Sequence, residues 1–158
     1  MTVRIDEATA NAALTAVAPE LGTAVTDFMR LAYTGSTVDV VTRELVRIYS
    51  GQQTRCRFCS NTRVRGAVER GMDETVVAKV EDFEHSDLPE RQRAALRLAR
   101  SFLLDPAAFG PDDLTALAVH FGPDQIAELV LDLIRLRPGS KLHIATGMDE
   151  DVAERILL

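Results

Sequence analysis

The chain has 158 residues, a length that suits one domain with its own hydrophobic core. Its apolar fraction of 46% and charged fraction of 27% are ordinary for a globular protein, and its net charge of −6 argues against general nucleic-acid binding. No apolar run approaches the roughly 20 residues that cross a bilayer, and the N-terminal residues lack the apolar stretch of a secretory signal, so we expect a cytoplasmic protein without membrane contacts.

Apolar residues recur at helical spacing along nearly the whole chain, and no segment shows the alternation that is typical of a strand. The spacing predicts helices over about 6–18, 19–32, 38–50, 56–70, 74–80, 89–103, 112–121 and 124–136, with shorter helical segments at 142–146 and 149–158. Residues 1–158 therefore read as a single all-α domain of about eight helices.

Capping and helix-breaking residues predict several of the boundaries. Ser36 or Thr37 is expected to cap the third helix, and Gly51 is expected to end or loosen it. Asp73 is expected to cap the fifth helix. The pair Pro138-Gly139 is expected to separate the helix over 124–136 from the segment that follows it.

One window of the chain concentrates both positive charge and cysteine. Residues 43–71 carry seven arginines and two glutamates, a net charge of +5, and they hold the chain's two cysteines, Cys56 and Cys59. If a helix begins at Cys56, then Cys56, Cys59 and Arg63 share one of its faces, and the two thiols can approach disulfide distance. The helix N-terminus and the arginines supply the positive potential that lowers a thiol pKa. In the cytoplasm such a pair is more often redox-active or metal-binding than a structural crosslink.

Simpler interpretations of these residues remain open. The cysteines can be small buried hydrophobic residues. A zinc site normally takes four ligands, and the chain has no second cysteine pair, while His85, His120 and His143 are scattered, so we expect no metal and no cofactor. The arginines can form a solvated helix face, which is the preferred interpretation for Arg65 and Arg70.

The cysteine segment resembles the carboxymuconolactone decarboxylase / AhpD-like alkylhydroperoxidase family. Members of that family carry the pattern C-x-x-C-x-x-x-H on a helix, with a glutamate twelve residues before the first cysteine. Glu44 stands twelve residues before Cys56, and Ala67 and Gly71 match the small residue and the glycine that follow the motif. The resemblance covers roughly residues 19–136, and it implies an AhpD-like helical bundle.

The chain departs from the family pattern at one position, because Arg63 stands where the family has its histidine. In the family, that histidine and the glutamate are thought to relay protons to the cysteine pair. An arginine can stabilise a thiolate but cannot accept a proton, so water, Glu44, His120 or His143 would have to act as the base. Two of these have simpler interpretations, since Glu44 can form an ion pair with Arg47 and His120 can cap a helix end.

The resemblance implies a thiol-dependent, peroxidase-like oxidoreductase. One cysteine would reduce a hydroperoxide and the other would close a disulfide, which an external dithiol would then reduce. The position of Arg63 favours Cys59 as the attacking sulfur, whereas Cys56 lies nearer the helix terminus. A carboxymuconolactone-type decarboxylase and a non-catalytic helical module remain alternatives. The family also implies a homo-oligomer, either a trimer or a hexamer.

Overall fold

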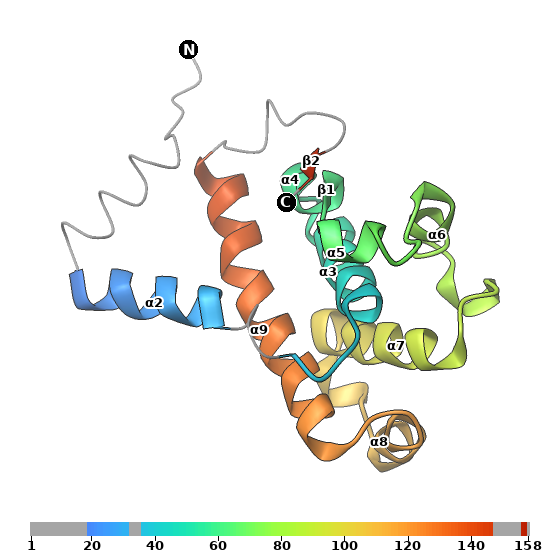
Figure 1. The fold of residues 1–158 in the computed structure, drawn as a ribbon. Coiled ribbons are helices and arrows are strands. Elements are labelled where there is room, and N and C mark those ends of the chain that lie inside the picture. Colours follow the sequence, from blue (N-terminus) through green and yellow to red (C-terminus); the bar gives the residue numbers. More distant parts are fainter. Residues whose placement is uncertain (1–18, 32–35, 147–155, 158) are drawn as a thin grey trace.

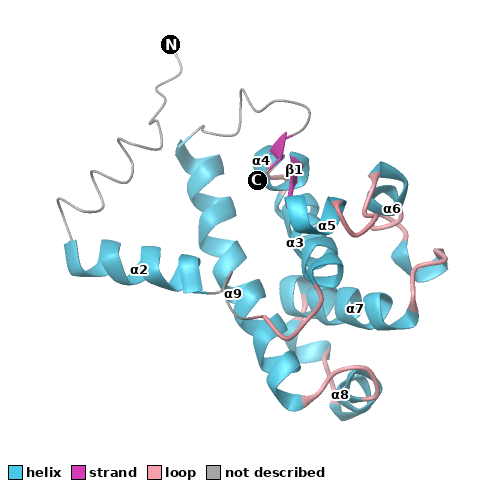
Figure 2. Ribbon diagram, viewed as in Figure 1, coloured by secondary structure: helices cyan, strands magenta, loops and turns pink. Residues whose placement is uncertain are grey.

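The computed structural model describes residues 19–31, 36–146 and 156–157, and most of them are helical (Figures 1 and 2). The described α-helices are α2 (Pro19–Leu31), α3 (Val40–Thr54), α4 (Arg57–Asn61), α5 (Arg65–Val68), α6 (Glu74–Ala78), α7 (Glu90–Leu104), α8 (Pro111–Ala118) and α9 (Pro123–Thr146). Two 3₁₀ turns, η1 (Phe83–His85) and η2 (Pro106–Ala108), flank α7, and two short strands, β1 (Thr62–Arg63) and β2 (Ile156–Leu157), pair in parallel. The all-α class with eight helices is confirmed, while the helix expected over 6–18 lies outside the described residues. Within the described part of the chain, no helix combines the length and the hydropathy that crossing a membrane requires.

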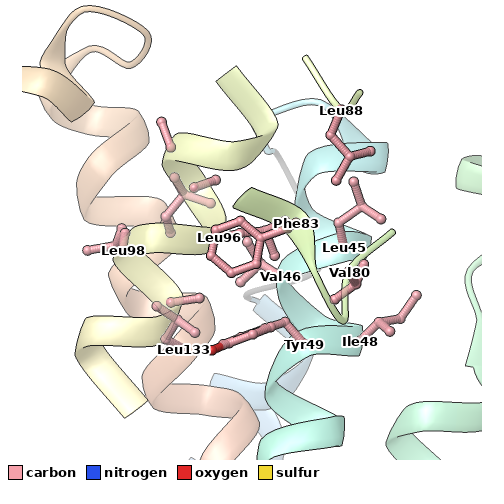
Figure 3. Packing of buried hydrophobic residues seen from close by; sticks show 14 of the residues in the cluster. Leu45, Val46, Ile48, Tyr49, Val80, Phe83, Leu88, Leu96, Leu98 and Leu133 are labelled. Atoms are coloured by element: carbon pink, nitrogen blue, oxygen red, sulfur yellow. The ribbon is translucent and has the colours of Figure 1, made fainter. Parts of the chain in front are cut away.

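Helix α3 is the centre of the fold, and it packs against α4, α7 and α9. The amphipathic pattern of α3 directs Leu45, Val46, Ile48 and Tyr49 into a buried cluster with side chains of α7, α9 and the segment after α6 (Figure 3). The ring of Tyr49 meets that of Phe83 edge to face, with centroids 5.7 Å apart. The end of α3 that leads into the cysteine segment is therefore held by a well-packed core.

A part-buried ion pair ties α3 to α9. The guanidinium of Arg43 donates to both oxygens of Asp132, from Nε at 2.6 Å and from Nη2 at 2.9 Å. The Asp132 side chain is 5% exposed, and Arg135 of the same helix approaches it at 3.5 Å. Bidentate geometry fixes both the distance and the orientation of the two groups, so this pair sets how α9 lies along α3.

The cap of α3 differs from the prediction. Asp39 is the N-cap, and its Oδ1 accepts the Thr42 N–H at 2.9 Å. Ser36 and Thr37 bind Glu128 of α9 instead, with the Thr37 N–H 2.9 Å from Oε2 and the Ser36 hydroxyl on Oε1. An aspartate nearer the first apolar turn thus takes the capping role, and the two hydroxyl residues fasten the preceding loop to α9.

Two expected helix breaks are absent. Gly51 lies inside α3, which runs on to Thr54 and ends where Arg55 adopts a left-handed conformation at φ 56°. Likewise α9 continues through Pro138, because the carbonyl that the proline leaves without a donor belongs to Ile134, on the exposed side of the helix, where water can satisfy it.

Two further expectations near the cysteines are wrong. The single helix expected over 56–70 is divided into α4, β1 and α5. The terminal helix expected over 149–158 is contradicted at 156–157, which form a strand, while 147–155 and 158 lie outside the described residues. The strand registers Thr62 with Ile156, so it satisfies backbone groups that the break after α4 leaves unpaired. The expected cap of the next helix is confirmed, since Asp73 accepts from the first turn of α6.

Candidate functional site

The two cysteines meet at the start of α4, as expected. Cys56 is the N-cap residue, and its Sγ accepts the Cys59 N–H at 3.3 Å, in the place that an oxygen usually takes. The two cysteines are reduced, and their sulfurs lie 2.9 Å apart. Cys56 is 0% exposed, whereas Cys59 is partly exposed. The left-handed Arg55 makes this arrangement possible, because it turns the chain from α3 into α4 within two residues.

Gly51 brings α3 directly against the cysteine helix. A Cβ at this position would lie 2.8 Å from the Cβ of Cys59 and 3.0 Å from the backbone nitrogen of Ser60. Two of the nearest atoms are backbone, so no rotation of a side chain relieves the overlap. Only glycine allows this contact, and the contact sets the depth at which Cys59 lies.

Glu44 and Arg47 form a buried brace beneath the same helix. Arg47 donates to both carboxylate oxygens of Glu44, at 2.7 Å and 2.8 Å, and it also donates to the carbonyls of Cys59 and Thr62. The Val64 N–H donates to Glu44 Oε1 at 2.9 Å. The ion pair that the sequence offered as the simpler interpretation of Glu44 is therefore present. Through Arg47, it holds the carbonyl of Cys59 and the residue after α4.

The sequence predicted that Arg63 shares a helix face with the thiols, and this prediction is wrong. Helix α4 ends at Asn61, and Arg63 belongs to β1. Its guanidinium donates to the two oxygens of Glu74, at 3.0 Å and 2.9 Å. It also donates to the carbonyls of Ser60 and Thr62, at 2.6 Å and 2.7 Å. Within the described residues, the partners of Arg63 are thus a carboxylate and two carbonyls, and its position supports the backbone that follows the motif.

Ser140 is a site residue that the sequence did not reveal. Its Oγ lies 3.3 Å from the Sγ of Cys59, across 81 residues of sequence, and its side chain is buried. The serine reaches Cys59 because α9 runs unbroken past Pro138. The expected break at Pro138-Gly139 concealed this contact, and no motif marks the residue.

His120 and His143, the two histidines proposed as substitute bases, lie in different parts of the fold. His120 lies in the turn after α8 and lines a cavity of about 290 Å³ between α7 and α8, to which no residue of the cysteine segment contributes. Its carbonyl accepts from Arg91. His143 lies three residues beyond Ser140 in α9. In the described part of the chain, no three His, Cys, Asp or Glu side chains gather in a group that could hold a metal ion.

Comparison with known proteins shows which family the chain belongs to. Residues 19–101 match the family model of the carboxymuconolactone decarboxylase family. An uncharacterised protein of Mycobacterium tuberculosis is 34% identical over 113 residues, which cover 71% of this chain and 39% of the relative. The chain thus spans well under half the length of that curated relative.

Solved structures share the fold. A protein of Agrobacterium tumefaciens, described as a putative antioxidant defence protein AhpD, superposes with a TM-score of 0.73 at 15% identity, over 88% of this chain and 96% of that one. An alkylhydroperoxidase AhpD core of Ralstonia eutropha superposes with a TM-score of 0.68 at 20% identity, over 85% and 72%. With the family match over more than half of its residues, the chain belongs to the carboxymuconolactone decarboxylase family and has an AhpD-like fold.

Proposed function

We propose that this protein is a thiol-dependent, peroxidase-like oxidoreductase in which Cys56 and Cys59 reduce a hydroperoxide. The observation that carries the proposal is the 2.9 Å separation of the two sulfurs at the N-terminus of α4. A disulfide needs about 2.05 Å, so closing the pair requires the sulfurs to move by less than about 1 Å. Membership of the family supports a peroxidase-related or decarboxylase-like role, and this thiol geometry favours the first.

Cys59 is the sulfur that we assign to the attack. It is the partly exposed member of the pair, whereas Cys56 is fully buried, so a dissolved peroxide reaches Cys59 first. The assignment agrees with the one made from the sequence but rests on access to solvent. Arg63, whose predicted position first favoured Cys59, binds Glu74 instead.

The reaction proceeds in three steps. The Cys59 thiolate attacks one peroxide oxygen, so that an S–O bond forms, the O–O bond breaks, and the alkoxide takes a proton and leaves as an alcohol. The Cys56 thiol then attacks the sulfur of the Cys59 sulfenic acid, the S–S bond forms as the S–O bond breaks, and the hydroxyl takes the Cys56 thiol proton and leaves as water. An external dithiol supplies the two electrons that reduce the disulfide again. Glu44 is already bound by Arg47, so we assign the uptake of the Cys59 proton to water.

The arginine-rich window over residues 43–71 is a weaker binding site for an anionic substrate than the sequence suggested. Three of its arginines, Arg43, Arg47 and Arg63, are each bound by a carboxylate of the chain itself. A decarboxylase would need cations that are available to the substrate carboxylate, so these pairs weaken that alternative.

Consumption of cumene hydroperoxide with dithiothreitol as the donor tests the proposal. We expect turnover by the wild type and none by Cys59→Ser, while Cys56→Ser should consume peroxide without forming the intrachain disulfide. A wild-type rate equal to that of the doubly substituted protein would refute the proposal. Release of carbon dioxide from a carboxylated lactone would then assign the decarboxylase role, and its absence would favour a non-catalytic module. Light scattering would measure the homo-oligomer that the family leads us to expect.

A further inference from the structure

We infer that Ser140 is a positioning residue for Cys59, and that its hydroxyl donates a hydrogen bond that stabilises the Cys59 thiolate. This inference rests on the proposed function, since it concerns the sulfur assigned to the attack. It gives α9 a part in the chemistry, although Ser140 lies 81 residues after Cys59 in the sequence.

The contact between the two side chains is direct, and the serine is buried. The Ser140 Oγ lies 3.3 Å from the Cys59 Sγ, and Ser140 is 1% exposed. A hydroxyl can donate or accept, but a thiolate can only accept, so ionisation of Cys59 fixes Ser140 as the donor. A hydrogen bond made to the charged form of a group favours that form. The serine therefore lowers the pKa of the Cys59 thiol relative to a site without a donor.

The usual alternative for a serine inside a helix does not apply to Ser140. Such a hydroxyl commonly bonds back to the carbonyl four residues earlier. Within the described residues, the partner of the Ser140 hydroxyl is instead the sulfur of Cys59. The hydroxyl is thus directed out of α9 and toward α4.

The charges around Cys59 come from the elements packed against it, and they do not depend on Ser140. On α3, Arg47 is bound to Glu44 and to the Cys59 carbonyl. On β1, Arg63 is bound to Glu74 and to the carbonyl of Ser60. Arg57 of α4 itself is exposed, as is Lys141, which follows the serine in α9. Replacing Ser140 by alanine removes one dipole and leaves these charges in place.

The test is the pH dependence of Cys59 alkylation by iodoacetamide in the reduced protein. Trypsin cleaves after Arg57, so Cys59 is read on the peptide 58–63, separately from Cys56. Four proteins are compared: the wild type, Ser140→Ala, Ser140→Thr and Ser50→Ala. Ser50 is the matched control, because it is also buried and its hydroxyl has no hydrogen-bond partner within the described residues. Circular dichroism of each variant verifies that it is folded.

We expect Ser140→Ala to move the Cys59 profile to higher pH by about one unit, which is tenfold in the thiolate fraction below both midpoints. Ser140→Thr, which keeps a hydroxyl, should restore most of the shift, and Ser50→Ala should leave the profile unchanged. Equal profiles for the wild type and Ser140→Ala, or equal shifts for alanine and threonine, would overturn the inference. The measurement uses no peroxide, so a peroxidase-inactive wild type would refute the proposed function and leave this result standing.

Discussion

Gly51→Ala should destabilise the protein, although alanine is the better helix former. The substitution places a methyl group 2.8 Å from the Cβ of Cys59 and 3.0 Å from backbone atoms of the cysteine helix, so α4 has to move away from α3. Overpacking of this kind costs about 1–3 kcal/mol, while the helix propensity of alanine returns up to about 1 kcal/mol. We therefore expect a net loss of about 1–2 kcal/mol and slower closure of the disulfide, because the motif moves with the helix.

Gly66→Ala is the matched control for this substitution. A Cβ at Gly66 would meet side-chain atoms no closer than 3.5 Å, so the variant gains helix propensity without overlap and should be up to about 1 kcal/mol more stable. Urea unfolding followed by circular dichroism compares the two, and a difference of about 1 kcal/mol corresponds to roughly 2–4 °C in melting temperature. If Gly51→Ala is stabilised as much as Gly66→Ala, then the close approach of α3 to the cysteine helix is wrong.

Three further predictions concern charged residues. Asp132→Ala removes the bidentate hydrogen bonds of Arg43 and leaves its longer 3.6 Å contact with Glu128, so it should lower the free energy of unfolding by about 1–3 kcal/mol in urea; an unchanged free energy of unfolding would contradict the role of this ion pair. The hydrogen bond from Arg97 lowers the pKa of Glu84, although burial alone would raise it. The ion pair therefore stabilises the folded protein above about pH 4.5, the usual pKa of a glutamate, and this stabilisation is lost as the pH falls through the lower pKa of Glu84 in the folded state. Glu84→Gln should thus be less stable than the wild type at neutral pH, by about 1 kcal/mol or less, and the difference should vanish in acid; a constant difference would argue against this ion pair. Arg63→Ala should destabilise by about 1–3 kcal/mol and move the Cys59 alkylation profile by less than Ser140→Ala does, because Glu74 offsets the charge of Arg63; a larger rise in the Cys59 pKa would restore the thiolate contact expected from the sequence.

The helical pattern predicted the fold well because α3 and α7 each bury one face. Their apolar residues repeat at 3.6-residue spacing, and this pattern predicted the ends of both helices to within a few residues. The errors fall where tertiary contacts decide. Glycine and proline usually weaken a helix, yet Gly51 and Pro138 each lie inside one. A side chain at position 51 would overlap α4, and the ring of Pro138 is on the exposed side of α9. The strand at 156–157 could not be predicted, since two residues carry no periodicity.

In the site, too, local features were predicted correctly and features that depend on tertiary packing were not. Local spacing was enough to place Cys56 at a helix start and Cys59 within reach of it, because both distances are set within four residues of sequence. Spacing misplaced Arg63, since it assumed that the helix continued beyond Asn61. Ser140 was out of reach for any local argument, because only the packing of α9 brings it to the thiol.

A single turnover tests the central claim most directly. The reduced protein is mixed with one equivalent of cumene hydroperoxide, and the remaining thiols are blocked with N-ethylmaleimide. The masses of the tryptic peptides are then measured by mass spectrometry. We predict one cumyl alcohol per chain and an intrachain disulfide joining the peptide 56–57 to the peptide 58–63, with neither cysteine alkylated. Two alkylated cysteines and unconsumed peroxide would contradict the proposed peroxidase function.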